Sequence, residues 1–322
     1  MKILANDGIA KSGIDAMESS GFKVITDKVD QSQLIDYINK NDITALLVRS
    51  ATKVRKDIID ACPNLKLIGR GGVGMDNIDV DYARNKGLHV INTPGASSAS
   101  VAELVFAHLF GMVRFLFDAN RNMPLEGDTR FKELKKSYGA GIELRGKKIG
   151  IIGFGRIGRE VAKIALGQGM EVIAHDTHCK NAKIEIDFYD GQQVNFNINT
   201  VAIEEVYKNA DFITVHVPFQ GKPLISKKEI EMMKDNVGLV NAARGGVINE
   251  VDLLDALESG KIRYAGLDVF ENEPTPNMKV LMAHQISLSP HIGAATLEAQ
   301  DRIGTELALS LIHISEPTRR RG

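Results

Sequence analysis

The sequence is short of the features that mark disulfide-rich, metal-binding and membrane proteins. Only two cysteines occur, Cys62 and Cys179, and neither has a second thiol or a histidine at zinc-site spacing. This excludes a disulfide framework, predicts no metal site and indicates free thiols in a reducing cytoplasm. No segment approaches about 18 uncharged apolar residues, and the N-terminus reaches Asp7 before a signal core could form. We therefore expect a soluble protein that is not exported and contacts no membrane.

The chain also lacks an excess of charge of either sign. It has 40 Lys and Arg residues against 41 Asp and Glu residues, so no global field would recruit nucleic acid or a membrane surface. Its 322 residues leave room for two domains, each with its own core. The arginine-rich ending, residues 316–322, is interpreted as a disordered tail.

Short apolar runs alternate with helical stretches in the first part of the chain. The predicted strands are residues 2–6, 22–26, 45–49, 65–68 and 88–92. Such alternation of strands and helices predicts a parallel sheet. We expect a first α/β domain over residues 1–95.

A long apolar helix is predicted next, over residues 97–117, followed by a polar, lysine-rich loop up to Lys148. Its apolar positions are too many for one stripe: Val101, Leu104, Val105, Leu109, Phe110, Val113 and Leu116. A helix that is apolar over more than one face packs on two sides. We therefore expect a homodimer formed through this helix after Ser97.

A second series of strands begins near Lys148. The predicted strands are residues 149–153, 171–175, 212–217, 238–241, 264–269 and 286–289. Six strands are typical of a dinucleotide-binding domain. Ser226-Lys-Lys-Glu229 has the spacing of a helix capping box. A final helix from Thr296 is predicted to bury Ala299, Ile303, Leu307 and Leu311.

Two segments have the spacing Gly-x-Gly-x-x-Gly, and each follows a predicted strand: Gly69-Arg-Gly-Gly-Val-Gly74 and Gly153-Phe-Gly-Arg-Ile-Gly158. After Gly158 an amphipathic helix follows at once, and the next strand ends at Asp176, about 20 residues further on. After Gly74 a helix begins only near Asp79. The context of the second segment therefore predicts the cofactor site.

The second fingerprint predicts contacts to a dinucleotide. Its pyrophosphate contacts are expected at Gly153, Gly155, Arg156, Ile157 and Gly158. Glycines let the backbone approach the pyrophosphate, and the first N–H groups of the helix face it. Asp176 would accept hydrogen bonds from the ribose hydroxyls and repel a 2′-phosphate, which favours NAD over NADP.

Three later segments supply an arginine, two glutamates and a histidine. Arg244 follows a predicted strand, where a planar guanidinium could bind a carboxylate through two hydrogen bonds. His291 follows the last strand and could transfer a proton near neutral pH. Either Glu271 or Glu273 could orient that histidine and favour its protonated form. This set indicates oxidation of an alcohol or reduction of a ketone.

Together these motifs resemble the D-isomer-specific 2-hydroxyacid dehydrogenases, over nearly the whole chain up to about residue 310. The matching segments are residues 147–158, 240–246, 267–274 and 289–296. The resemblance implies a catalytic trio of Arg244, Glu273 and His291, because the family's glutamate directly precedes a proline. It further implies that Val73, Val217, Ala242, Ala243, Asp268 and Gly293 contact NAD, with Asp268 near the nicotinamide amide.

The resemblance also implies an architecture. The fold class would be α/β, with two Rossmann-like or flavodoxin-like domains, parallel sheets and an active site in the interdomain cleft. Residues 1–95 with 288–322 would form a discontinuous substrate-binding domain, and residues 96–287 the NAD-binding domain.

Within the family, the motifs around Arg49 and Arg70 are most similar to those of D-3-phosphoglycerate dehydrogenases. Both arginines could bind a substrate phosphate. The implied substrate contacts are Arg49, Ser50, Arg70, Val73, Gly74, Arg244 and His291. No regulatory domain of the longer relatives follows, so we expect no serine feedback through one. The ending, residues 314–322, does not resemble the family, which leaves open whether it is native.

Three alternative activities remain at this point. The first two belong to the same family and are those of a glyoxylate/hydroxypyruvate reductase and of a D-lactate dehydrogenase. The third is that of an NAD-sensing transcriptional corepressor of the C-terminal-binding type, which uses the same fold.

Overall fold

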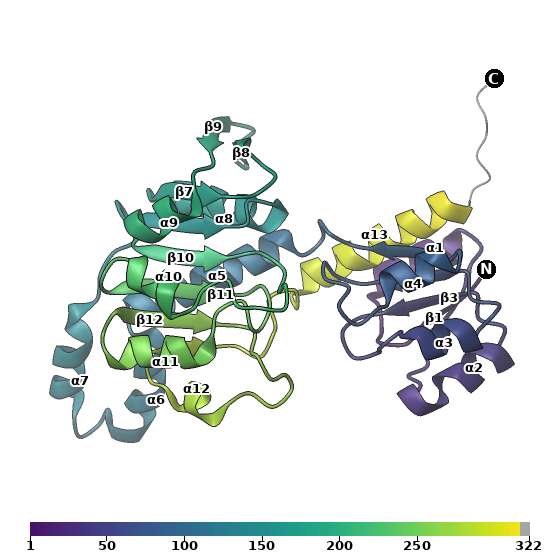
Figure 1. The fold of residues 1–322 in the computed structure, drawn as a ribbon, viewed down its shortest axis with the longest axis horizontal. Helices are drawn as coiled ribbons and strands as arrows, with labels where there is room; N and C mark the ends of the chain where they lie inside the picture. Colours follow the sequence, from purple (N-terminus) through teal and green to yellow (C-terminus); the bar gives the residue numbers. More distant parts are fainter. Residues whose placement is uncertain (316–322) are drawn as a thin grey trace. The chain divides into compact units, whose positions relative to one another are not determined.

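The computed structural model describes residues 1–315 (Figure 1). The chain divides into two compact units, one formed by Met1–Ser98 with the C-terminal segment from Ala294, and the other by Ala99–Gly293. Each unit has its own parallel sheet and its own hydrophobic core. The predicted disordered tail, residues 316–322, lies outside the described residues, as does most of the ending that does not resemble the family.

The first unit contains a five-stranded parallel sheet in the order β2-β1-β3-β4-β5. Its strands are β1 (Lys2–Ala5), β2 (Lys23–Ile25), β3 (Ala45–Val48), β4 (Leu67–Arg70) and β5 (His89–Asn92). This is the flavodoxin-like strand order. The predicted parallel sheet is confirmed. The fourth strand begins two residues later than expected, which makes Arg70 its last residue.

Helices cover both faces of this sheet. The helices on one face are α1 (Lys11–Ser19) and α13 (Leu297–Ser315), and those on the other are α2 (Leu34–Lys40), α3 (Lys56–Ala61) and α4 (Val80–Asn85). Helix α13 buries the predicted stripe of Ala299, Ile303, Leu307 and Leu311. It contacts α1 backbone to backbone, because a Cβ atom on Gly13 would lie 2.6 Å from the Cα atom of Gly304.

The second unit contains a six-stranded parallel sheet in the order β13-β12-β11-β10-β6-β7. Its strands are β6 (Lys148–Ile152), β7 (Glu171–His175), β10 (Phe212–Val215), β11 (Val237–Asn241), β12 (Ile262–Leu267) and β13 (Ile286–Leu288). The six predicted strands are confirmed. The strand order reverses beside β6, and ligands of such sheets bind at the carboxyl ends of the strands at this point.

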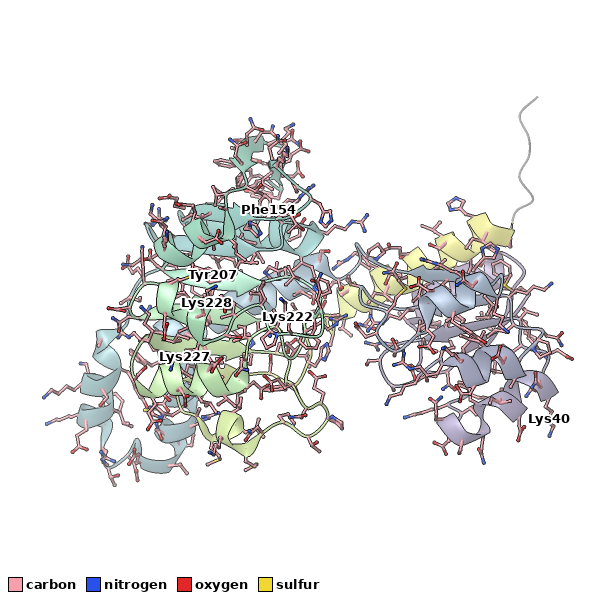
Figure 2. The ribbon with its side chains drawn as sticks, viewed as in Figure 1. Lys40, Phe154, Tyr207, Lys222, Lys227 and Lys228 are labelled. Atoms are coloured by element: carbon pink, nitrogen blue, oxygen red, sulfur yellow. The ribbon has the colours of Figure 1, made fainter. Side chains whose placement is uncertain are left out.

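Two cores lie on the two faces of the second sheet. The helices on the first face are α5 (Ser98–Val113) and α8 (Arg156–Gly167), and those on the second are α9 (Ile203–Asn209), α10 (Lys227–Met232), α11 (Glu250–Glu258) and α12 (Met278–Met282). Phe154 is fully buried in the first of these cores (Figure 2). The predicted capping box is present at the start of α10, where the N–H of Ser226 donates to Glu229 Oε2 at 3.0 Å.

The lysine-rich loop predicted up to Lys148 is wrong, because this segment forms α6 (Leu116–Glu126) and α7 (Phe131–Ser137). The middle of α6, Asp118-Ala-Asn-Arg-Asn122, is polar and Pro124 lies inside the helix, so the sequence did not indicate a helix there. The long helix expected over residues 97–117 ends at Val113. Phe115, just before α6, has a left-handed backbone angle φ of 54°, and this bend in the backbone separates α5 from α6.

An antiparallel hairpin was not predicted. It consists of β8 (Asn181–Asp187) and β9 (Gln193–Asn199), and Figure 1 shows it projecting beyond β7. Ile184 is buried at its base against α8. Apolar residues near its tip stay exposed, including Phe188 and Tyr189.

Among residues 1–315, no single helix is long and apolar enough to cross a membrane. The pair α5 and α6 passes this test only when taken together, although the two helices are bent by 57°, and most of α5 is core. Within the same residues, no group of three or more His, Cys, Asp or Glu side chains could hold a metal ion.

Candidate active site

The turn between β6 and α8 has the shape that a dinucleotide requires. Gly153 has a positive φ of 96°, and a Cβ atom there would lie 2.6 Å from the carbonyl oxygen of His216. A Cβ atom on Gly158 would lie 2.2 Å from the carbonyl oxygen of Gly153, so the helix rests directly on the turn. A Cβ atom on Gly155 would meet no atom of residues 1–315 within 4 Å apart from its neighbours along the chain. A pyrophosphate can therefore approach the first N–H groups of α8, near Arg156 and Ile157.

Asp176 follows β7 and accepts three backbone hydrogen bonds. Its Oδ2 atom accepts from the N–H of Phe154 at 2.7 Å, and its Oδ1 atom accepts from His178 and Cys179 at 2.8 and 3.0 Å. Burial by itself would raise the pKa of Asp176, but the three N–H groups outweigh it and the pKa lies below its usual value. The side chain is therefore held ionised at the edge of the Gly153 turn.

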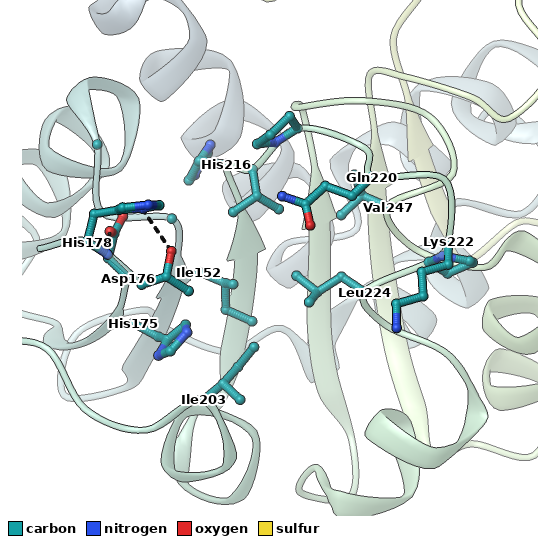
Figure 3. A pocket seen from close by; sticks show the side chains of 16 residues that line it. Ile152, His175, Asp176, His178, Ile203, His216, Gln220, Lys222, Leu224 and Val247 are labelled. Atoms are coloured by element: carbon teal, nitrogen blue, oxygen red, sulfur yellow. Dashed lines mark hydrogen bonds between the residues drawn. The ribbon is translucent and has the colours of Figure 1, made fainter.

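A pocket of about 350 Å³ opens between these elements (Figure 3). Four predicted cofactor residues line it, namely Gly153, Gly155, Asp176 and Val217. Its apolar walls were not predicted and come from Ile152, Ile203, Leu224 and Val247. Part of the lining could be expected, since Val217 and Pro218 lie two and three residues after β10 at the carboxyl edge of the sheet, but no spacing rule connects them to Ile203.

Arg244 lies in a turn that follows β11. The side chain of Asn241 fixes this turn, because it accepts from the N–H of Ala243 at 3.0 Å and donates to the carbonyl oxygen of Arg244 at 2.9 Å. A Cβ atom on Gly245 would lie 1.8 Å from the carbonyl oxygen of Phe270. The arginine turn is thus in direct backbone contact with the turn that carries Glu273.

The side chains of Glu273 and His291 meet. Glu273 Oε2 lies 2.8 Å from His291 Nδ1, and Glu273 Oε1 accepts from the N–H of Phe270 at 3.0 Å. Both side chains stay partly exposed, with 37% and 43% of their surface accessible. This contact leaves Nε2 of His291 to exchange a proton with a ligand.

Glu271, the other glutamate of this segment, faces a different partner. Its Oε1 atom accepts from the N–H of Glu250 at 2.9 Å, and its own N–H donates to Glu250 Oε1 at 2.7 Å. The pair joins the start of α11 to the glutamate turn. Burial raises the pKa of Glu250, and the nearby Glu271 carboxylate adds to this effect, against the backbone hydrogen bond from Glu271.

Asp268 is buried and organises the loop after His291. It accepts from the hydroxyl of Ser289 at 2.6 Å and from the N–H groups of Ile292 and Gly293 at 2.8 and 2.9 Å. His291 itself has a left-handed φ of 55°. Both oxygens of Asp268, which follows β12, are thus engaged by the segment that follows β13.

A second pocket, of about 460 Å³, lies beside Glu273 and His291 and was not predicted. Apart from Ser289, its other lining residues are apolar, among them Phe270, Leu281 and Leu288. No sequence pattern predicts this pocket, because its walls come from separate segments of the chain.

The remaining predicted substrate residues lie in the first unit. Arg49 and Ser50 follow β3, and the backbone N–H of Arg49 donates to Asp7 Oδ2 at 2.7 Å. Arg70 ends β4, and its guanidinium lies over Gly72, where a Cβ atom would overlap it. Val73 and Gly74 follow in the same loop. These residues share the carboxyl edge of the first sheet, whereas Arg244, Glu273 and His291 belong to the second unit.

Comparison with known proteins identifies relatives over almost the whole chain. The hydroxypyruvate reductase of Thermotoga maritima is 41% identical over 312 residues, which cover 95% of both chains. The D-3-phosphoglycerate dehydrogenase of Methanocaldococcus jannaschii is 41% identical over 310 residues, which cover 96% of this chain and 56% of that protein. The chain therefore spans a little over half the length of this second relative.

A solved structure agrees with the sequence relatives. The D-lactate dehydrogenase of Aquifex aeolicus, crystallised with NAD and lactic acid, matches with a TM-score of 0.74 at 27% identity, covering 98% of this chain and 95% of that one. The family model for the D-isomer specific 2-hydroxyacid dehydrogenase, NAD binding domain, matches residues 106–293, which include β6, α8 and the Glu273 and His291 pair. The chain thus belongs to the D-isomer-specific 2-hydroxyacid dehydrogenase family, and its cofactor is NAD.

Proposed function

We propose that the chain catalyses the reversible NAD-dependent oxidation of D-3-phosphoglycerate to 3-phosphohydroxypyruvate, the first step of L-serine biosynthesis. The observation that carries a dehydrogenase mechanism is the 2.8 Å contact between His291 Nδ1 and Glu273 Oε2, in an NAD-binding unit. Arg49 and Arg70, both at carboxyl ends of first-unit strands, support a phosphorylated substrate.

The reaction uses three side chains of the second unit. The bound nicotinamide ring supplies the hydride acceptor for oxidation. Neutral His291 takes the proton of the C2 hydroxyl through Nε2, and Glu273 stabilises the imidazolium that forms. Arg244 binds the substrate carboxylate and polarises the developing carbonyl. Because the reverse reaction needs protonated His291, reduction should prefer a lower pH than oxidation.

The cofactor contacts follow from the same proposal. The ionised Asp176 carboxylate binds the ribose hydroxyls and repels a 2′-phosphate, so NAD is preferred to NADP. Further NAD contacts are proposed at Ala242, Ala243 and Gly293 of the second unit and at Val73 of the first. Asp268 is proposed to act near the nicotinamide amide. Its oxygens already accept from Ser289, Ile292 and Gly293, so a direct contact would add to these bonds.

The substrate contacts assign a role to each unit. The first unit would bind the substrate, with Arg49, Ser50 and Arg70 on the phosphate and the N–H groups near Val73 and Gly74 on the carboxylate. The second would bind NAD and carry the reacting groups. The cytoplasmic location and the homodimer stay predictions.

Reduction of hydroxypyruvate is the second candidate. It is favoured by the Thermotoga relative, a hydroxypyruvate reductase that matches over 95% of both chains. An NADH-absorbance assay with D-3-phosphoglycerate, D-glycerate, D-lactate and hydroxypyruvate compares the two. We expect the highest kcat/KM with D-3-phosphoglycerate among the hydroxyacids. A preference for D-glycerate and hydroxypyruvate would favour the reductase instead, and turnover of none of them would contradict both.

The phosphate role of Arg49 has its own test. Replacing Arg49 with Ala should lower kcat/KM for D-3-phosphoglycerate by about 10- to 100-fold, as expected for loss of a hydrogen bond to a charged group. Activity on unphosphorylated acids should change little. Arg55→Ala is the matched control, because Arg55 pairs with Asp79 at 2.9 Å in the same unit. An equal loss on both kinds of substrate would refute the role.

A further inference from the structure

His108 of α5 is almost fully buried, yet both of its ring nitrogens have polar partners. Its Nδ1 atom lies 2.8 Å from the hydroxyl of Ser287, and its Nε2 atom lies 2.9 Å from the hydroxyl of Ser289. These serines belong to β13 and the residue that follows it. Strand β12 makes room for the ring, because a Cβ atom on Gly266 would lie 2.8 Å from the Cβ atom of His108. The imidazole of His108 therefore connects α5 to β13 through two hydrogen bonds.

The hydrogen bonds that link Ser287, His108, Ser289 and Asp268 can be assigned one consistent set of donors and acceptors. The hydroxyl of Ser289 donates to Asp268 Oδ1, so its oxygen is left to accept from His108. The proton of the neutral ring then lies on Nε2, and Nδ1 accepts from the hydroxyl of Ser287. Burial lowers the pKa of His108 in spite of the nearby Asp268 carboxylate, which agrees with a neutral ring.

This series of hydrogen bonds ends at the backbone N–H groups that follow His291. Asp268 receives the Ser289 hydroxyl and, in addition, the N–H groups of Ile292 and Gly293. Helix α5 makes a second, direct contact with the same loop, because the hydroxyl of Ser100 donates to the carbonyl oxygen of Gly293 at 2.6 Å. A left-handed φ is costly for a residue with a side chain and persists only where surrounding contacts hold it. His291 is such a residue.

We propose that His108 is a positioning residue for His291, acting through Ser289 and Asp268 on the backbone of Ile292 and Gly293. The proposal rests on the proposed function, in which His291 moves the substrate proton. His108 touches neither His291 nor Glu273 among its hydrogen-bond partners, so its effect is on geometry. Loss of the His108 bond would leave the Ser289 hydroxyl without one of its partners and loosen the carboxylate that fixes the loop.

Two conservative variants separate the two arms of the ring. In His108→Gln the amide NH₂ can replace Nε2–H as donor to Ser289, whereas in His108→Asn the shorter side chain reaches only the position of Nδ1, near Ser287. We expect His108→Asn to lower kcat by about 10-fold, the size of a lost buried hydrogen bond, with KM for the hydroxyacid within about twofold. His108→Gln should stay close to the wild type. Phe106→Leu, a buried change on the same helix, should lower the melting temperature and leave kcat unchanged.

Hydrogen exchange of the ligand-free protein provides a readout that does not need activity. The amides of Ile292 and Gly293 should exchange faster in His108→Asn than in His108→Gln or Phe106→Leu. Equal exchange and equal kcat in the Asn and Gln variants would overturn the proposal. If the wild type turned over no 2-hydroxyacid while the exchange difference was present, the proposed function would fail and the positioning of the loop would stand.

Discussion

At the scale of single residues, Glu271 and Glu273 lie on one turn but serve different partners. Glu273 contacts His291, whereas Glu271 exchanges hydrogen bonds with Glu250. We predict that Glu273→Gln lowers kcat by about 10²-fold or more, because the imidazolium loses its charged partner. The measurement is steady-state kinetics in both directions with the preferred substrate.

Glu271→Gln is the matched control for this change. It should leave kcat nearly unchanged and change the free energy of unfolding by less than about 1 kcal/mol, since the weaker hydrogen bond from the N–H of Glu250 is offset by relief of the repulsion between the two carboxylates. A large loss of kcat in Glu271→Gln, with Glu273→Gln active, would reverse the assignment.

We expect the buried His216 to make the free energy of unfolding depend on pH. Its Nδ1 atom is buried without a hydrogen-bond partner among residues 1–315, and burial lowers its pKa to about 3. Below the ordinary histidine pKa of about 6.5, His216 is therefore protonated in the unfolded chain and neutral in the folded chain. The free energy of unfolding falls as the pH falls from about 6.5 towards about 3. His216→Gln should lose about 2 kcal/mol less than the wild type between pH 7 and pH 5.

Urea unfolding followed by circular dichroism at the two pH values measures this difference. The absolute stability of His216→Gln does not matter, because only its change with pH is compared. If both proteins lost the same free energy on acidification, His216 would not be the group that titrates on unfolding.

The segments that carry the proposed reacting residues could be recognised in the sequence, but the contacts that hold these residues could not. Strand ends and motif spacing indicated Arg244, His291 and a glutamate. Which glutamate faces His291 depends on the path of one turn, and periodicity carries no information about that path. The buried contacts of His108 were missed for a similar reason, because its partners Ser287 and Ser289 lie far along the chain.

At the scale of elements, two glycines of the turn between β6 and α8 have different roles, one in folding and one in cofactor binding. Gly158→Ala would place a Cβ atom 2.2 Å from the carbonyl oxygen of Gly153, so we expect it to be destabilising. Gly155→Val meets open space beside the turn, and should leave the melting temperature nearly unchanged while weakening NAD binding by at least about 10-fold. Calorimetric titration with NAD and thermal unfolding measure the two effects. Tight NAD binding by Gly155→Val would contradict a pyrophosphate at this position.

The elements that escaped prediction have local causes. Hairpin β8–β9 has alternating apolar residues, such as Ile184 and Phe196, around an Asp190-Gly191 turn, so its pattern was present in the sequence. Helix α6 was harder to recognise, since its middle is polar and Pro124 lies inside it. The sheets were predictable because both faces of each are covered, which makes their strands continuous apolar runs.

At the scale of the whole molecule, the predicted homodimer can be tested through α5. Phe110 is exposed on α5 on the same side as Glu103 and Ala107, and Leu125 and Phe131 are exposed on α6 and α7. We predict that light scattering gives twice the monomer mass and that Phe110→Glu shifts the protein towards monomer, because a charge would be buried at the interface. Val251→Glu, at an exposed position of α11, should not. A monomeric wild type at all concentrations would contradict the prediction.

The return of α13 to the first unit has a consequence for synthesis on the ribosome. Ala308 and Leu311 of this helix complete the core that contains Ile3, Ala5 and Leu47. The first unit can therefore finish folding only after the entire second unit has left the exit tunnel. Domains usually fold in the order in which they are made. In this chain the N-terminal strands therefore lack part of their core until α13 has been translated.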